Sequence, residues 1–571
     1  MDQEKTTAVK ETKAQRAERL KTAKNPWECF AEIEEFARKG FDSIPDEWLK
    51  TYFRWWGVYT QGDGLGVLGG KGGEGKAAPY FMLRIRIPNG FLRSDQLRTV
   101  ARIAEEHTRG FADLTVRQNI QLHWVTIEAL PEIFRRLWDC GLTTMAACGD
   151  DTRNITGCPL AGVDASELCD ASPLVFEAQK MLVGAEEFYN LPRKFKICIT
   201  GCPVWCSYPE INDIGLTAQV RRINGNRETG FSICVGGGLS TQPNFAVRLP
   251  AFVQWNQVMP VVKGVAEIFR DADCLREARE RARLKYLFMR HGWTAESFLA
   301  ALEDRLGFRL DPAEPDNAPT DAYRDHVGVY PQKQPGRFYV GVAVLRGRVS
   351  AAQIAAAADL SERYGSGEVR ITGMQNLVVV NVPKHEVDNL VSGLEDVDLR
   401  ISASPFWRGA ISCTGTEFCK LAITETKSFT RWLVEDLEKR MPGFDQHLKI
   451  DVTGCPNSCG QNWIADIGLE GKRIKLNGKM ADAYYFSLGG AVGKHQAFSH
   501  QVGYRCAAED VPASITRLLY TYLDEREEGE NFRSFCARKP DDELRAALAG
   551  EEAAVLAGGA PAGPAAVGLD G

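Results

Sequence analysis

An internal repeat constrains the fold of this chain more than any other feature of its sequence. Residues 194–216 read KFKICITGCPVWCSYPEINDIGL, and residues 447–469, which lie 253 positions later, read HLKIDVTGCPNSCGQNWIADIGL. TGCP, the C-x3-C pair and DIGL hold the same positions in both segments. Upstream, Arg153 precedes Cys158 by five residues, as Arg408 precedes Cys413. Two copies of a module of about 250 residues predict pseudo-twofold symmetry, with a functional site where the copies meet.

A pattern of strands and helices repeats along with these motifs. Residues 80–88 alternate like a strand, residues 95–108 have helical periodicity, and residues 113–127 alternate again. The same order returns at 338–350, 351–365 and 368–383. This arrangement predicts an α+β fold built from a duplicated module.

The composition limits the class of protein. Of the 571 residues 44% are apolar and 25% are charged, and no run of ~18 apolar residues occurs. We therefore expect a globular protein without a transmembrane helix. The charged N-terminus lacks the apolar segment of a secretory signal, so the cytoplasm is the expected compartment. The formal net charge of −6 gives no electrostatic reason to expect nucleic-acid binding.

Two cysteine pairs in the second copy indicate a metal centre. The pairs are Cys413-x5-Cys419 and Cys455-x3-Cys459, and the chain has sixteen cysteines in all. In a reducing compartment such cysteines serve metal or redox chemistry more often than disulfides. Four thiolates from two loops can hold an iron–sulfur cluster or a zinc ion. The spacings differ from those of common zinc sites, so the pattern favours a cluster, with structural zinc as the alternative.

The first copy keeps only part of this set. Cys158, Cys202 and Cys206 match three of the four cysteines, whereas Asp164 stands where Cys419 would be. Three thiolates and an aspartate make a poor cubane site, so we expect these cysteines to pack as small hydrophobic side chains. A second metal site is the alternative.

The first copy also carries a group of cations, namely Arg117, Arg153, Lys194 and Lys196. Lys194 and Lys196 point to the same face, because side chains alternate along a strand. Any one of them alone would be an ordinary solvated charge. Together they predict a pocket for a small anion or for a cofactor with several carboxylates.

At these residues the chain resembles the siroheme-dependent nitrite and sulfite reductases of assimilatory metabolism. The resemblance covers nearly the whole chain and rests on several motifs in the correct order. These motifs are the C-x5-C and C-x3-C pairs, VRQN, the RNITG loop, LPRKFK, ARLKYL and TGCPNSC. It implies a fold with ferredoxin-like half-domains and two siroheme/Fe–S-type α/β domains.

The resemblance also implies roles for individual residues. Cys413, Cys419, Cys455 and Cys459 would ligate a [4Fe–4S] cluster, and Cys459 would in addition bridge to the siroheme iron. The four cations would hold the anionic substrate and supply protons. The positions that match siroheme contacts are Asn119, Gln121, His123 and Lys285.

We expect six parts along the chain. An N-terminal arm and helical cap (1–60) precedes the first ferredoxin-like half-domain (61–145) and the first siroheme- and substrate-binding domain, with its degenerate cysteine set (146–325). The second half-domain (326–403), the [4Fe–4S]- and siroheme-binding domain (404–550) and a disordered, low-complexity tail (551–571) follow.

Two features favour sulfite over nitrite as the substrate. Lys196 stands where nitrite-selective relatives often carry Asn, and a second lysine suits a doubly charged anion. Tyr59 and Cys148 match positions that form a Tyr–Cys crosslink in actinobacterial-type sulfite reductases. The alternative substrate is nitrite, reduced to ammonia by the same centre. The alternative for Tyr59 and Cys148 is that they are packed core residues.

The electron donor is inferred from the domains present. No flavin or nicotinamide motif such as G-x-G-x-x-G follows a strand, so we expect ferredoxin or a similar one-electron carrier to dock on a monomer. More distant alternatives are a zinc-stabilised binding protein and an iron–sulfur carrier without siroheme.

Overall fold

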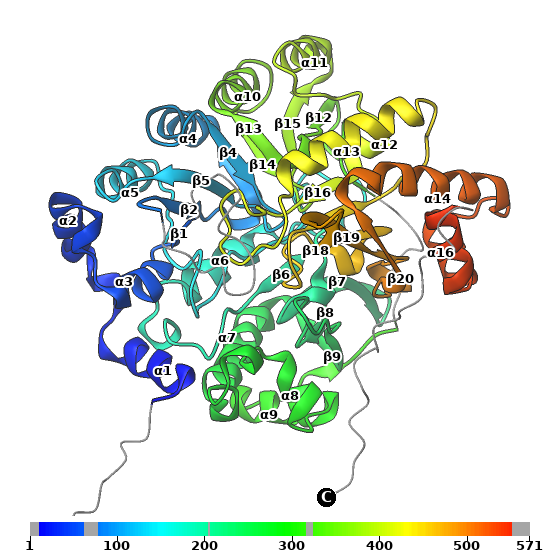
Figure 1. The fold of residues 1–571 in the computed structure, drawn as a ribbon. Coiled ribbons are helices and arrows are strands. Elements are labelled where there is room, and N and C mark those ends of the chain that lie inside the picture. The colour runs from blue at the N-terminus through cyan, green and yellow to red at the C-terminus, as the bar shows by residue number, and fades with distance from the viewer. Residues whose placement is uncertain (1–10, 62–77, 204–205, 316–323, 551–571) are drawn as a thin grey trace, which may run out of the picture.

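Four five-stranded sheets form the body of the molecule (Figure 1). The structure is a computed structural model that describes residues 11–61, 78–203, 206–315 and 324–550. The predicted tail at 551–571 lies outside these ranges. None of the helices within them is long and apolar enough to span a membrane.

Two of the sheets exchange strands between the copies. The first has the order β1 (Val58–Thr60), β2 (Phe81–Ile85), β5 (Ile120–Val125), β4 (Phe111–Leu114) and β13 (Arg348–Ser350). The second has the order β11 (Gly328–Pro331), β12 (Arg337–Val342), β15 (Leu377–Pro383), β14 (Glu368–Ile371) and β3 (Phe91–Arg93). Val349 of the second copy thus pairs with Ala112, and Leu92 of the first copy pairs with Val369. Each copy completes the sheet of the other.

A row of helices covers the outer face of these two sheets (Figure 1). Its members are α5 (Leu130–Asp139), α4 (Ser94–His107), α10 (Ala351–Tyr364) and α11 (Val387–Glu395). Ser350 caps α10, because its hydroxyl accepts a hydrogen bond from the backbone N–H of Gln353. One hydrophobic core runs through both sheets and this layer, so the two half-domains form a single unit.

The other two sheets carry the TGCP repeat. One has the order β10 (Asp311–Pro312), β9 (Val247–Gln254), β8 (Asn226–Val235), β7 (Ile214–Ile223) and β6 (Ile197–Thr200). Its counterpart has the order β16 (Ala410–Ser412), β17 (Ile450–Thr453), β18 (Ile467–Leu476), β19 (Lys479–Leu488) and β20 (His500–Ala507). Ile197 pairs in parallel with Ile214, and Ile450 pairs in parallel with Ile467, so the repeat persists at the level of strand register.

Helices complete each of these domains. The first is covered by α6 (Ser172–Leu182), α7 (Val258–Arg270), α8 (Lys285–Arg290) and α9 (Ala295–Leu306). The second has α12 (Pro405–Gly409), α13 (Lys427–Arg440), α14 (Val511–Glu525), α15 (Phe532–Arg538) and α16 (Asp541–Ala549). Before the first half-domain come α1 (Lys13–Ala23), α2 (Phe30–Lys39) and α3 (Asp46–Lys50).

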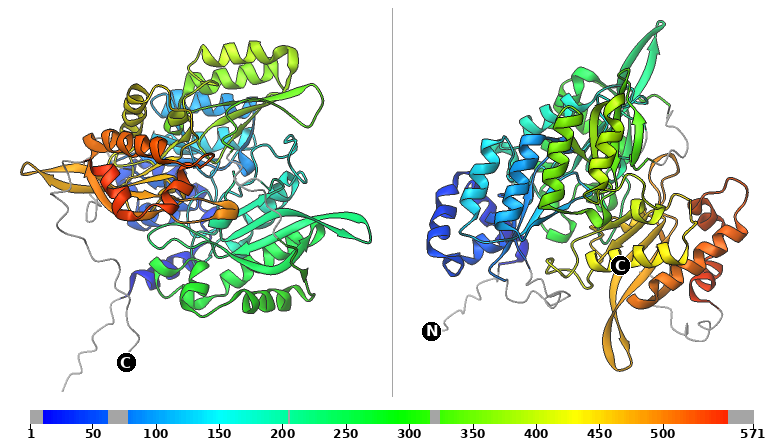
Figure 2. Two further views of the ribbon diagram at one scale, coloured as in Figure 1. Left: turned by 90° about the vertical axis from the view of Figure 1, so that its right-hand side faces the viewer. Right: turned by 90° about the horizontal axis from the view of Figure 1, so that it is seen from above.

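The β7–β8 and β18–β19 hairpins project from opposite sides of the molecule (Figure 2). Both turn at an Asn-Gly pair, Asn224-Gly225 and Asn477-Gly478, in which all four residues have positive φ. Two-residue turns of this kind match the twist of the flanking strands. The predicted α+β fold with duplicated modules is therefore confirmed.

Candidate functional site

The second copy's cysteines lie on two loops at the carboxyl ends of adjacent parallel strands. β16 leads to Cys413, and β17 leads to Cys455 and Cys459. The backbone N–H of Cys413 donates to the carbonyl of Val452 (3.1 Å), and the N–H of Gly454 donates to Sγ of Cys413 (3.3 Å). The two loops are therefore held directly against each other.

The four thiols form one electrostatically coupled group. Burial, followed by repulsion from Cys459, raises the pKa of Cys419 and of Cys455 to about 12 and also raises the pKa of Cys413. Cys455 is buried and Cys413 and Cys419 are half-buried, whereas Cys459 is exposed. The exposed thiol is the one for which the family resemblance implies a second bond, outside the cluster.

The spacing of these thiols distinguishes between the two candidates for this site, a zinc ion and a [4Fe–4S] cluster. A zinc ion at ~2.3 Å from each sulfur places tetrahedral thiolates roughly 3.8 Å apart. Within the described residues, two groups of His, Cys, Asp or Glu have three or more ligand atoms within 4.8 Å of one another, and neither includes these cysteines. The wider arrangement fits the larger core of a [4Fe–4S] cluster better than a zinc ion.

Lys194 and Lys196 of the first copy form no ion pair among the described residues. Both are half-buried on the same side of the strand that continues as β6, with the buried Phe195 between them. Among the described residues, neither ammonium group has a hydrogen-bond or ion-pair partner. Burial, then repulsion from Arg283, lowers the pKa of Lys194 to about 7. Burial, then repulsion from Lys194, lowers the pKa of Lys196 well below its usual value.

Arg153 lies beside these lysines and is held by the backbone. Its Nη1 donates to the carbonyl of Ala147 and its Nη2 to that of Gly149, both at 3.0 Å. Burial lowers the pKa of Arg153, but Tyr59 and Cys148, followed by the carboxylates of Asp151 and Asp150, outweigh that effect, so the net pKa is raised. Arg153 also contributes to the repulsion that lowers the pKa of Lys194.

Arg84 is a cation of this group that the sequence interpretation missed. Its Nη1 donates to Sγ of Cys148 (2.8 Å) and to the carbonyl of Ala147 (3.2 Å), the acceptor that Arg153 also uses. A signal was present, because YFMLRIRIP places Arg84 and Arg86 on one face of an otherwise apolar strand. Arg86 is fully buried, and its Nη2 donates to the carbonyl of Arg153 (2.9 Å), so it supports the same loop.

The structure gives Arg117 partners within the protein. Its Nη1 donates to Oδ1 of Asn212 (2.6 Å) and its Nη2 to the carbonyl of Asn154 (2.7 Å). Burial lowers the pKa of Arg117 to about 10. Arg117 also contributes to the repulsion that lowers the pKa of Lys196, which places its charge next to the lysines even though its hydrogen bonds are made.

Asn119 and Gln121 lie at the first copy's VRQN motif, on the side of the cations. Oδ1 of Asn119 accepts a hydrogen bond from the backbone N–H of Ile87 (3.3 Å). The amide of Gln121, oriented with its oxygen toward Arg84, accepts from Nε of that arginine (3.1 Å). Gln121 therefore fixes the direction of the Arg84 guanidinium.

His123 connects the first copy to the cysteine loop of the second. Its ring is fully buried and stacks on Phe418, the residue before Cys419, with ring centroids 4.0 Å apart. Nε2 lies 3.4 Å from Oδ2 of Asp113. Asp113 also pairs with Arg348 at 2.8 Å. The imidazole thus braces the loop that carries Cys413 and Cys419.

Lys285, at the start of α8, is buried and donates to three backbone carbonyls. The acceptors are Gly238 (3.3 Å), Leu239 (3.0 Å) and Gln242. Burial, then repulsion from Arg283, lowers the pKa of Lys285 to about 7. Its contacts hold the loop that follows β8.

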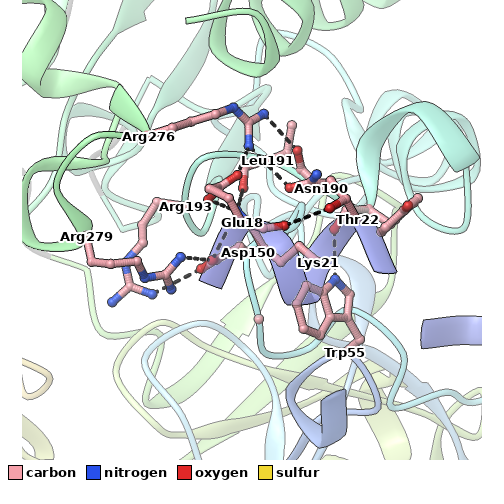
Figure 3. Close-up of polar contacts among 12 residues, drawn as sticks. Glu18, Lys21, Thr22, Trp55, Asp150, Asn190, Leu191, Arg193, Arg276 and Arg279 are labelled. Atoms are coloured by element: carbon pink, nitrogen blue, oxygen red, sulfur yellow. Dashed lines mark hydrogen bonds and ion pairs between the residues drawn. The ribbon is translucent and has the colours of Figure 1, made fainter. Parts of the chain in front are cut away.

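An ion-pair network behind the cations anchors the N-terminal helix α1 (Figure 3). Lys21 of α1 is 1% exposed, and its Nζ contacts Oε1 of Glu18 (2.6 Å) and Oδ2 of Asp150 (3.6 Å). Nζ also donates to the carbonyl of Leu191 (2.9 Å). Asp150 in turn binds Arg193, the neighbour of Lys194, at 3.1 Å. A helix outside both repeated modules thereby supports the loop and strand that carry Arg153 and Lys194.

The two halves of the site converge. Cys459 of the second copy acts to raise the pKa of Lys194 of the first copy, against the larger lowering by burial and by nearby arginines, so the two groups lie within electrostatic range of each other. The second copy supplies four widely spaced thiols, one of them exposed, and the first copy supplies cations without a counter-charge in the described part of the chain. This arrangement fits a [4Fe–4S] cluster next to a cofactor with several carboxylates.

Comparisons with known proteins agree with this geometry. The family described as "Nitrite and sulphite reductase 4Fe-4S domain" matches residues 148–310 and 404–552. The family described as "Nitrite/Sulfite reductase ferredoxin-like half domain" matches residues 74–138 and 330–397. The predicted ferredoxin-like half-domains are therefore confirmed.

Individual relatives carry two different activities in their names. An assimilatory ferredoxin-dependent nitrite reductase of Haloferax mediterranei is 39% identical and covers 89% of each chain. A sulfite reductase [ferredoxin] of Mycobacterium tuberculosis is 37% identical, over 92% of this chain and 95% of the relative. The solved structure of the Mycobacterium tuberculosis NirA protein, at 37% identity, superposes with a TM-score of 0.88 and covers 93% of this chain and 97% of that one. The predicted family is confirmed: the chain belongs to the siroheme- and [4Fe–4S]-containing sulfite and nitrite reductases.

Proposed function

We propose that this chain reduces sulfite to sulfide with six electrons delivered one at a time by ferredoxin. The observation that carries this proposal is the pair of unpartnered ammonium groups of Lys194 and Lys196 beside Arg153. Reduction of nitrite to ammonia at the same centre is the second candidate, since relatives of both kinds are similar to this chain.

The cysteines divide between two tasks in this proposal. Cys413, Cys419, Cys455 and Cys459 would hold the [4Fe–4S] cluster, and Cys459 would also be the thiol that reaches the siroheme. Its exposure supports this second role, because a thiol enclosed like Cys455 would be out of reach. When bound, siroheme supplies an open iron position and a conjugated ring that passes electrons to the substrate.

The carboxylates of siroheme require donors around the ring. The resemblance implies that Asn119, Gln121, His123 and Lys285 lie at these contacts. Of these, Gln121 has the most direct position, next to Arg84. His123 and Lys285 already have buried partners, so we assign them the support of the loops against which the ring would lie.

The anion is held by Arg153, Lys194 and Lys196, to which we add Arg84. Fixed cations in a site shielded from water stabilise negative charge that develops during reduction, and they need no reorganisation to do so. Arg117 contributes charge from behind Lys196, because its own hydrogen bonds are made within the protein. With its pKa lowered to about 7, Lys194 can also deliver protons at neutral pH.

Lys196 is the residue on which the choice of substrate depends. Sulfite carries more negative charge than nitrite near neutral pH, so a second ammonium group beside Lys194 favours it. The test is Lys196→Asn with Lys196→Arg as the matched control. The Asn variant should move the ratio of kcat/KM for sulfite to that for nitrite toward nitrite, whereas Arg should keep it. An unchanged ratio in the Asn variant contradicts the assignment.

Two further features complete the proposal. Tyr59 and Cys148 form the crosslink that the resemblance implies, next to Arg84, whose Nη1 donates to Sγ of Cys148 (2.8 Å). The enzyme works as a monomer in the cytoplasm, where reduced ferredoxin is available.

A further inference from the structure

The degenerate cysteine set of the first copy forms a compact buried cluster of its own. Ligand atoms of Cys158, Asp164 and Cys202 lie within 4.8 Å of one another. Their side chains are buried, with relative exposures of 1%, 2% and 1%. Cys206 is a fourth buried group in the same apolar cluster, outside this set of three.

The ligand atoms of this cluster lie closer together than the four thiols of the second copy. Among the residues that the structure describes, no three of the second copy's thiols lie within 4.8 Å of one another, whereas three ligand atoms of the first copy, from Cys158, Asp164 and Cys202, do, and Cys206 would have to move in to complete a set of four. Tetrahedral zinc requires sulfurs roughly 3.8 Å apart and an oxygen at a similar distance. The copy that has Asp164 in place of the fourth cysteine is thus the one whose ligand atoms are spaced for a single ion rather than for a cluster.

The surroundings of the cluster suit a closed, structural metal site. The three cysteines belong to one apolar group that includes Tyr339 of β12 and two valines of β15, Val378 and Val380. One carboxylate oxygen of Asp164 accepts from the N–H of Ser166 (2.9 Å), and the other lies 2.8 Å from Nη1 of Arg324 and 3.6 Å from Sγ of Cys202. The carboxylate is therefore oriented toward the thiols, and Arg324 can offset the excess negative charge of a thiolate-rich site.

A buried imidazole borders the same cluster. His326 is 4% exposed and packs on Tyr339, with ring centroids 6.4 Å apart. Both of its ring nitrogens lack a hydrogen-bond partner within the part of the chain that is described. Burial, then repulsion from Arg324, lowers the pKa of His326 to about 4, so the ring is neutral at physiological pH.

We propose that Cys158, Cys202, Cys206 and Asp164 bind one Zn²⁺ ion as a closed structural site. The ion would fasten two loops of the first copy together against strands β12 and β15 of the second copy. This assignment is independent of the substrate and of the siroheme centre.

The test is metal analysis of the full-length holoenzyme, expressed with added zinc and dialysed against a weak chelator. We expect one zinc per chain in addition to the iron of the two cofactors. X-ray absorption at the zinc edge should give three sulfur neighbours at ~2.3 Å and one oxygen at ~2.0–2.2 Å. A preparation without zinc, or zinc surrounded by four sulfurs together with reduced iron content, overturns the proposal. The second of these outcomes would mean that zinc had displaced the cluster.

Variants locate the ion. Cys158→Ser should lower the zinc content by at least tenfold, whereas Cys536→Ser, at an equally buried cysteine of α15, should retain it. Zinc that persists in the Cys158 variant overturns the assignment. If that variant does not fold, the absorption measurement on the wild-type protein decides, because its sulfur-to-oxygen ratio is specific to this set of ligands.

Discussion

Arg84 and Arg153 donate to the same acceptor. Their Nη1 atoms lie 3.2 and 3.0 Å from the carbonyl oxygen of Ala147, although the two arginines come from β2 and from the loop before β6. Two guanidinium groups in this proximity repel each other, and a bound anion relieves that repulsion. In the proposed function, this pair would form the floor of the anion site.

Arg84→Gln should lower the catalytic efficiency with sulfite. Loss of one charge-assisted hydrogen bond costs about 1.5–3 kcal/mol, so kcat/KM for sulfite should fall roughly 10- to 100-fold. Steady-state assays with a reduced viologen donor measure this. Arg102→Gln, on the exposed side of α4, is the control and should leave kcat/KM unchanged. If the Arg84 variant behaves like the Arg102 variant, Arg84 has no place in the site.

Lys194 should impose an alkaline limit on activity. Its pKa is lowered to about 7, so the ammonium form that attracts the anion is lost as the pH rises through that value. We expect kcat/KM to decrease above about pH 7. Nitrite is the better probe, because it stays fully ionised across this range. In Lys194→Arg the side chain remains charged, and the decrease should move to higher pH; an identical profile would assign the titration to another group.

Lys21 should couple the N-terminal helix to the site. Lys21→Met leaves the buried carbonyl of Leu191 without its donor and removes one counter-charge from Asp150, which we expect to cost about 1–3 kcal/mol of stability. Thermal unfolding should show a lower Tm, and KM for the anion should rise because Arg193 is less firmly held. The matched control is Lys50→Met, whose exposed pair with Asp46 should contribute under ~1 kcal/mol. Equal effects of the two substitutions would contradict this account.

Cys459→Ser should separate stability from electron transfer. Because Cys459 is exposed, we expect the variant to keep the wild-type circular dichroism. It should nevertheless lose turnover of both anions, with altered cluster signals in electron paramagnetic resonance. A folded variant with wild-type turnover would show that the thiol does not link the two cofactors.

The fold was predictable where it rested on long patterns. Segments such as 113–127 alternate over many residues, and the TGCP repeat has a fixed register, so strands and duplication followed from the sequence. The exchange of β3 and β13 was not predictable, because three-residue strands carry no periodic signal and their pairing depends on the docking of the half-domains.

Some residues of the candidate site could likewise be predicted from the sequence, and others could not. Cysteine spacing and the paired lysines predicted a metal centre and an anion pocket, since those residue types have few other uses in such patterns. Arg84 was missed because an arginine in a strand resembles an exposed residue until its neighbours are known. Lys21 was missed because α1 is polar in sequence, and its burial arises only from contact with Asp150 and Leu191.

The most direct test of the central claim compares both substrates in the wild-type enzyme. With ferredoxin or a reduced viologen as donor, kcat/KM should be higher for sulfite than for nitrite, because Lys194 and Lys196 together favour the more highly charged anion. A kcat/KM for nitrite far above that for sulfite would contradict the account and identify the chain as a nitrite reductase.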